Sequence, residues 1–416
     1  MRTGLVVLVV AVGAFTVLGL VALWPRGSAP DLGAQPNEYV DATVRSLEEN
    51  ATCPGIEYSE PTPCTVYDVE LTSGPDKGDT IDLSVRMTQV EVPNLDVDDR
   101  IVLRDTPASP AGFRYSFYDF QRGTALLWLV AAFVVVVLVF GRFQGVRALA
   151  GLGLSLAVLV VFLVPALLRD RPAVAVALVA SIAIAYLAIY LAHGVRLAST
   201  IALAGTLVSL AFTCALAIGV AWVTHLSGLA SQEAQTLRMT ADALDLRGLL
   251  IAGIVVGALG VIDDLTVSQV STVMALRRAN PSMSARALYS AATKVGRDHV
   301  ASAVNTLVLA YAGASLPLLL FFTQGNQPAG RLLTGELVAV EIIRMLVGSI
   351  GLVLSVPITT RLAAIVLSRS DVPDDDSHDG HVHGDLDALD LLDDDLVDDV
   401  PPPRAREPEP HAEPWF

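Results

Sequence analysis

The segment GLLIAGIVVGALGVIDDLTVSQVST, residues 248–272, decides the fold class of this chain. Its first part is apolar for about 15 residues, or roughly 22 Å of helix, which is most of a bilayer crossing. Asp263 and Asp264 then interrupt the run, within the same predicted helix. Because a charge inside a bilayer is costly, each intramembrane carboxylate is a candidate functional residue. The segment therefore indicates a membrane protein with a polar site inside one helix.

Further apolar runs lie on both sides of this segment. Each is close to or longer than the roughly 18 residues that predict a transmembrane helix. They cover residues 5–24, 124–140, 146–168, 172–192, 197–224, 300–323 and 336–367. The composition agrees, because 53% of the residues are hydrophobic and only 17% are charged. We therefore expect an all-α polytopic membrane protein with about eight transmembrane helices.

The first apolar run is expected to stay attached as an N-terminal anchor, residues 1–24. Its apolar part is long for a signal peptide, and it ends in Trp-Pro-Arg rather than at a small-residue cleavage site. A cleaved signal peptide is the alternative. The remaining runs make up a seven-helix membrane domain, residues 123–368.

Residues 25–122 form a polar block that we expect to fold as a small all-β domain. Its strand-like stretches alternate with turn residues rich in Gly, Pro, Asp and Asn. Short strands over this length fit a small barrel or sandwich, of which an OB-like fold is one form. Cys53 and Cys64 are predicted to form a disulfide if the block is exported, since it contains no His that would favour a metal site.

The orientation follows from the distribution of basic residues. With the N-terminus in the cytoplasm, eleven Lys and Arg residues fall in inside segments and five in outside membrane loops. An excess of basic residues marks the cytoplasmic side. We therefore expect a multi-pass cell-membrane protein with both termini in the cytoplasm. The same orientation exports the polar block and its two cysteines.

The formal charge of −16 belongs to the polar block and to the C-terminal tail, residues 369–416. Residues 371–416 alone hold 16 acidic and two basic residues, a composition typical of disorder. Acidic appendages repel nucleic acid, which excludes it as an expected partner. The histidines of the tail are a weak metal-binding candidate, and incidental histidines in a solvated tail are the alternative; they are His378, His381 and His383.

Two groups of polar residues could form a site within the membrane. Beside Asp263 and Asp264, the first group contains Thr266, Ser268 and Gln269. The second lies in the last two predicted spans and contains His299, Asn305, Tyr311, Glu341 and Arg344. These groups are candidates for binding a solute or ion.

A structural role is the alternative for the same residues. Asp263 or Asp264 could satisfy Asn305 and Arg344 without any ligand. Glu341 and Arg344 are spaced i, i+3, which favours a structural ion pair on one helix face. His299 lies near the expected membrane interface, where a histidine could exchange protons.

Enzymatic templates find no support in the sequence. It contains no phosphate-binding loop, no Gly-x-Ser-x-Gly elbow and no His-Glu-x-x-His pair. We therefore expect neither an enzymatic activity nor a cofactor.

Three stretches of this sequence resemble the YibE/YibF family of bacterial membrane proteins. They are Gly257–Gln269, Arg297-Asp298-His299 and Asn305–Pro317. The resemblance covers most of residues 120–368 and, loosely, the exported block. It implies a multi-pass membrane protein and favours treating the two polar groups as one site, but it implies no particular substrate.

The leading hypothesis is a permease or channel for a solute or ion, with a carboxylate coupling the substrate to a cation or proton. The alternative is a membrane scaffold or sensor that transports nothing, whose exported domain binds an envelope protein. Besides the lipid bilayer, the expected partners are therefore an unidentified solute or ion, or an envelope protein.

Overall fold

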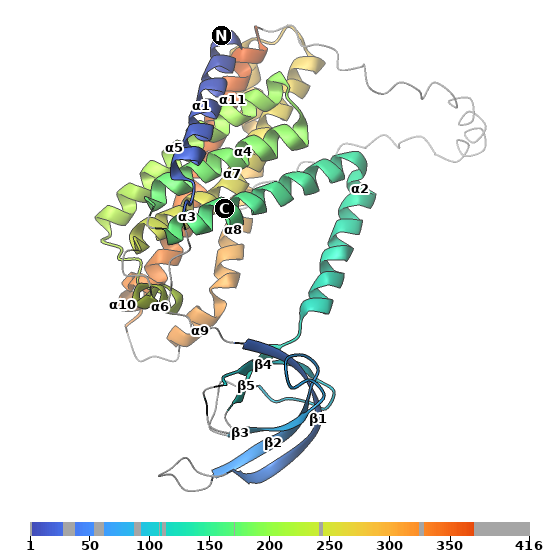
Figure 1. Ribbon diagram of the computed structural model, residues 1–416. Coiled ribbons are helices and arrows are strands. Elements are labelled where there is room, and N and C mark those ends of the chain that lie inside the picture. The colour runs from blue at the N-terminus through green and yellow to red at the C-terminus, as the bar shows by residue number, and fades with distance from the viewer. Residues whose placement is uncertain are drawn as a thin grey trace, which may run out of the picture. The chain divides into compact units, whose positions relative to one another are not determined.

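The computed structural model describes residues 2–27, 38–53, 62–86, 93–107, 109, 114–169, 171–240, 244–323 and 328–369. They form a helical part and one small antiparallel sheet (Figure 1). The acidic tail with His378, His381 and His383 lies outside the described residues. Its disorder and its weak metal site therefore stay predictions.

Six helices among the described residues are long and apolar enough to cross a membrane. This number supports the membrane character of the chain, whereas the expected number of eight spans is not confirmed. The candidates are Thr3–Leu23, Gly123–Leu168, Ala173–His193, Leu197–Val223, Leu246–Ala279 and Glu336–Leu367. Two departures from the predicted helix boundaries account for the difference.

The first departure is a bend where the sequence predicts a loop. α2 (Gly123–Ala157), the π-helical η1 (Val158–Leu163) and α3 (Val164–Leu168) follow one another as a single run of 46 residues. The backbone of Arg142 leaves the helical region, with φ 46° and ψ −129°, and Figure 1 shows the resulting bend in α2. Since one crossing needs about 20 residues, the run is long enough for two.

The second departure is a break inside the predicted span 300–323. α8 (Ala285–Ala314) ends at Ser315, and the short α9 (Leu316–Thr323) begins immediately after it. Pro317 explains the break, because proline has no N–H to donate to the preceding turn and its ring clashes with that turn. Neither helix is among the six candidates.

The sheet contains β1 (Glu38–Cys53), β2 (Thr62–Leu71), β3 (Thr80–Arg86), β4 (Arg100–Asp105) and β5 (Tyr115–Phe120). Its strand order is β3-β2-β1-β4-β5, and every neighbouring pair is antiparallel. Side chains at alternate positions are buried because successive residues of a strand point to opposite faces, as at Val40, Ala42, Val44, Ile101 and Leu103.

The small all-β unit expected from the sequence is therefore present. Its edge strands β3 and β5 are not hydrogen-bonded neighbours in the described residues, so an OB-like closure stays a prediction. The register pairs Cys64 with Ala51 and Cys53 with Thr62. The side chains of both cysteines lie outside the described part of the chain, so their disulfide also stays a prediction.

The helical part is organised around α5 (Leu197–Val223), α7 (Leu246–Ala279) and α11 (Glu336–Leu367), while α4 (Ala173–His193) packs against α7. α5 and α11 meet along a line of small residues that we call the α5–α11 seam. Its members are spaced by four residues on each helix, which places them on one face, and all are buried. They are Gly205, Ser209 and Thr213 on α5, and Gly351, Ser355 and Thr359 on α11.

Each glycine of the seam lies against the threonine of the other helix. A methyl group on Gly205 would overlap Thr359, and one on Gly351 would overlap Thr213. Small residues let helix backbones approach closely, which is how helices associate in a bilayer. The two helices therefore pack antiparallel with reciprocal contacts, and α7 lies beside both.

At the start of α11, Glu336 holds the loop that leads from α5 to α6 (Gln232–Thr240). Its Oε1 accepts hydrogen bonds from the backbone N–H groups of Ser227 and Gly228, at 2.7 and 2.9 Å. The Ser227 hydroxyl lies 2.8 Å from both carboxylate oxygens. This clamp fixes one end of the helical part.

Candidate functional site

Asp263 lies on α7, the helix that packs against both α5 and α11 and that the side chain of Asp245 caps by accepting from the N–H of Gly248 at 2.9 Å. One carboxylate oxygen of Asp263, Oδ1, is buried, and no described residue makes a hydrogen bond to it. Buried polar atoms nearly always have partners, so an exception calls for an explanation. Asp263 is therefore the strongest candidate for a ligand-binding group.

Asp264 has a different environment from its neighbour. Its side chain is exposed, because adjacent residues on a helix point about 100° apart. His193, at the end of α4, interacts electrostatically with Asp264 and also with Arg147. The two carboxylates therefore face different surroundings, as expected from their spacing.

A pair of hydroxyl groups joins α7 to α5 next to Asp263. Thr266 and Thr206 are both fully buried, and their Oγ1 atoms lie 2.7 Å apart. The Thr266 hydroxyl also donates to the backbone carbonyl of Asp263 at 2.9 Å. The half-buried side chain of Asp263 therefore has hydroxyl groups from two helices close to its own turn.

Gln269 joins α7 to α11 about a turn further along. Its Oε1 accepts a hydrogen bond from Thr360 at 2.9 Å, and both side chains are fully buried. Its Nε2 is also buried and has no hydrogen-bond partner among the described residues. Gly296 of α8 packs against this amide, where a larger side chain would collide with it. Gln269 thus occupies a junction of three helices.

The residues expected from α8 approach α7 only in part. Nδ1 of His299 lies 3.4 Å from the hydroxyl of Ser268, a long contact that still places the half-buried imidazole beside α7. The hydroxyl of Tyr311 lies close to Gly257, where a methyl group would stand 3.1 Å from it. Asn305 is exposed, and no hydrogen bond joins it to Asp263 or Asp264 in the part of the chain that the structure describes.

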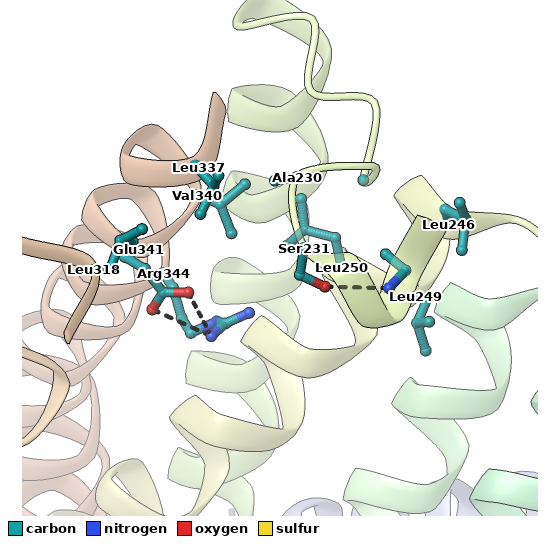
Figure 2. A pocket seen from close by; sticks show the side chains of 12 residues that line it. Ala230, Ser231, Leu246, Leu249, Leu250, Leu318, Leu337, Val340, Glu341 and Arg344 are labelled. Atoms are coloured by element: carbon teal, nitrogen blue, oxygen red, sulfur yellow. Dashed lines mark hydrogen bonds and ion pairs between the residues drawn. The ribbon is translucent and has the colours of Figure 1, made fainter. Parts of the chain in front are cut away.

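Glu341 and Arg344 form the expected ion pair, away from Asp263. Nη1 of Arg344 lies 3.1 Å from Oε1 and 3.2 Å from Oε2 of Glu341. The pair lines a pocket with residues of α7, α9 and the start of α6 (Figure 2). The structural alternative, in which Arg344 or Asn305 satisfies the α7 carboxylates, therefore has no contact to support it among the described residues.

Thr206 and Thr360 are site residues that sequence reasoning missed. Hydroxyl residues are common in apolar helices, so neither stands out in its own run. The only available signal was the repeated Gly-x3-Ser-x3-Thr spacing at positions 205–213 and 351–359, which marks the faces that meet at the seam.

The unpartnered oxygen of Asp263 is the group in this arrangement that can hold a proton or a small cation. Among the described residues, no group of three or more His, Cys, Asp or Glu side chains converges as metal ligands would.

Comparison with known proteins adds one finding. Residues 129–369 match the model of a family described as YibE/F-like protein. This range includes the two carboxylates, the seam and the ion pair. No curated protein and no solved structure matches the chain.

Proposed function

The chain belongs to the YibE/F-like protein family, and we propose that it is a permease or channel of the cell membrane for a small solute or ion. In this proposal Asp263 carries the proton or cation that moves with, or as, the substrate. Thr206, Thr266 and Gln269 shape the polar path beside it. Asp264 lies on the other side of the turn and is not part of the binding step.

The observation that carries the proposal is the buried, unpartnered Oδ1 of Asp263 within a candidate membrane span. Burying even one oxygen of a carboxylate without a partner is unfavourable, and a group with only a structural role is expected to be paired. Ionisable residues kept inside membrane helices mark substrate and proton pathways in many transport proteins. A carboxylate that waits for a cation or proton accounts for the missing partner.

A reconstituted system tests this role directly. Purified protein in liposomes that contain a dye for pH, Na⁺ or K⁺ is exposed to the matching proton, Na⁺ or K⁺ gradient. We expect the wild type to dissipate at least one gradient faster than empty liposomes, and Asp263→Asn to fall to the empty-liposome rate. Asp264→Asn is the matched control and should keep at least half of the wild-type rate.

The result that sinks the proposal is equally concrete. It would be abandoned if Asp263→Asn, folded and reconstituted to the same level, matched the wild-type rate under every gradient. A wild-type rate equal to that of empty liposomes throughout would also count against it.

The proposed orientation places both termini in the cytoplasm and the β-sheet unit outside. It rests on the excess of basic residues in the segments assigned to the inside. Single cysteines at Ser73 in the sheet unit and at Ser282 between α7 and α8 test it in intact cells. A membrane-impermeant maleimide should label position 73 and leave position 282 unlabelled, and the reverse pattern would invert the topology.

A second candidate function is a scaffold or sensor whose sheet unit binds an envelope protein. It is favoured by an exposed aromatic pair, Tyr39 and Tyr118, whose ring centroids lie 4.6 Å apart with Arg104 over the second ring. Exposed aromatic and arginine side chains are typical of protein interfaces. If this candidate is right, a variant that lacks residues 30–118 should still insert into the membrane but lose the protein's function in cells. A variant that retains function would refute it.

A further inference from the structure

A pocket of about 200 Å³ lies where α7 and α11 begin. It is separate from Asp263, which follows Leu250 along α7 by about 20 Å of helix. α6, α7, α9 and α11 all contribute to its wall, as Figure 2 shows. Most of the lining is apolar; its larger apolar members are Leu246, Leu249, Leu250, Leu318, Leu337 and Val340.

The charges in this apolar wall belong to Glu341 and Arg344. Their side chains keep 27% and 30% of their surface exposed, so both remain accessible from the pocket. A single guanidinium nitrogen, Nη1, contacts both carboxylate oxygens. Nε and Nη2 of Arg344 therefore have no hydrogen-bond partner among the described residues, and Figure 2 shows the guanidinium reaching from α11 toward α7.

The ion pair uses only part of the hydrogen-bonding capacity of Arg344 and Glu341. An arginine can donate two parallel bonds to a carboxylate, and a carboxylate can accept about four. Here the arginine keeps N–H groups for an anion, and the glutamate keeps lone pairs for a cation. An i, i+3 ion pair contributes only a few tenths of a kcal/mol, about 0.2–0.5, to helix stability by itself, so stability gives a weak reason for placing it in an apolar wall.

We propose that this pocket binds a small zwitterion with an apolar tail: an ammonium group at Glu341, an acidic group at Arg344 and the tail among the leucines. We choose a zwitterion because the pocket contains one negative and one positive side chain. A simple anion would be repelled by Glu341 and a simple cation by Arg344, whereas a zwitterion satisfies both. The inference concerns binding alone and does not depend on transport.

Two sources supply this chemistry, namely an apolar α-amino acid and a phospholipid with an ethanolamine headgroup. Purified protein in nanodiscs of phosphatidylglycerol is titrated with L-leucine, and binding is followed by calorimetry. 4-Methylpentanoate, which lacks the ammonium, and isoamylamine, which lacks the carboxylate, should bind at least about 10-fold more weakly, since each loses one charge-assisted contact. Nanodiscs containing phosphatidylethanolamine test the lipid as a competitor and as a source of thermal stabilisation.

Variants separate binding from structure. Arg344→Gln and Glu341→Gln should each weaken binding about 10-fold or more. The exchange Glu341→Arg with Arg344→Glu keeps an ion pair at the same spacing but reverses its polarity, so it should restore thermal stability without restoring the affinity. Arg331→Gln removes an exposed charge outside the pocket lining and is the matched control, with unchanged binding expected.

The binding experiments have outcomes that either support or overturn the proposed site. Leucine binding, or stabilisation by phosphatidylethanolamine, that is lost in Arg344→Gln supports the site and identifies its source. The proposal is overturned if neither probe binds the wild type. It is also overturned if binding survives in both single variants, or if the polarity exchange binds as tightly as the wild type.

Discussion

Gly205 of α5 lies directly against Thr359 of α11, so a methyl group at position 205 would overlap the threonine side chain. The relationship is reciprocal, because Gly351 of α11 lies against Thr213 of α5 in the same way. Both threonines are fully buried. The close approach of the two helices therefore depends on the absence of a side chain at both glycines, one at each end of the seam.

Gly205→Ala and Gly351→Ala should each lower the free energy of unfolding by about 1–3 kcal/mol, the usual cost of overpacking. Thermal unfolding in detergent measures the effect. Gly219→Ala on the same helix is the control, since nothing lies within 4 Å of the place that its methyl group would occupy. Adding Thr359→Ala to Gly205→Ala should recover part of the loss. Equal unfolding temperatures for the alanines at 205 and 219 would contradict the close approach.

The hydrogen bond between Thr360 and Gln269 predicts a second stability effect. Thr360→Val leaves the buried Oε1 of Gln269 without its donor, which should cost about 1–3 kcal/mol. Thr306→Val is the control, because that hydroxyl is exposed on α8. In a double-mutant cycle, Thr360→Val should cost less when Gln269 is already leucine. Additive costs would mean that the two side chains are not coupled.

The clamp made by Glu336 predicts a local effect at the start of α6. Glu336→Gln replaces charge-assisted hydrogen bonds to Ser227 and Gly228 with weaker neutral ones, so the loop should open more often. We expect faster backbone hydrogen exchange at residues 226–231, by about 10-fold for a loss of roughly 1.4 kcal/mol. Arg331→Gln, an exposed change five residues before Glu336, should leave the exchange unchanged. Identical exchange in the two variants would refute the clamp.

Ionisation of Tyr115 at alkaline pH is expected to lower the stability of the β-sheet. Burial, followed by its 2.6 Å hydrogen bond to Asp76, raises the pKa of Tyr115 to about 12. The unfolded value is about 10, so the folded state favours the protonated phenol. Its contribution is fully present below about pH 10 and is lost as the pH rises through about 12.

Tyrosinate absorbance during an alkaline titration measures this shift. The difference between the wild type and Tyr115→Phe isolates the titration of this one phenol, with an expected midpoint near pH 12. Asp76→Asn removes the carboxylate that accepts its hydrogen bond and should move the midpoint down. A difference midpoint near 10 would show that the phenol is not held as described.

The two carboxylates on α7 show how much of the candidate site can be predicted from the sequence. Asp263 and Asp264 stand out in an apolar run, so both could be identified as candidates. Which of them is buried depends on the helices that pack against α7, and the sequence carries no local signal for that choice. The same limit explains why Thr206 and Thr360 were missed, whereas the i, i+3 spacing of Glu341 and Arg344 was enough to expect their pairing.

The sequence by itself determined that the chain is a membrane protein that also forms a small β-sheet. Those features depend on the local cost of placing each residue in lipid or in a strand, and they add up along a run. Tertiary structure alone decided the bend at Arg142, the break before Pro317 and the seam between α5 and α11. It also left one oxygen of Asp263 buried without a partner, because burial there is set by helices far apart in the chain.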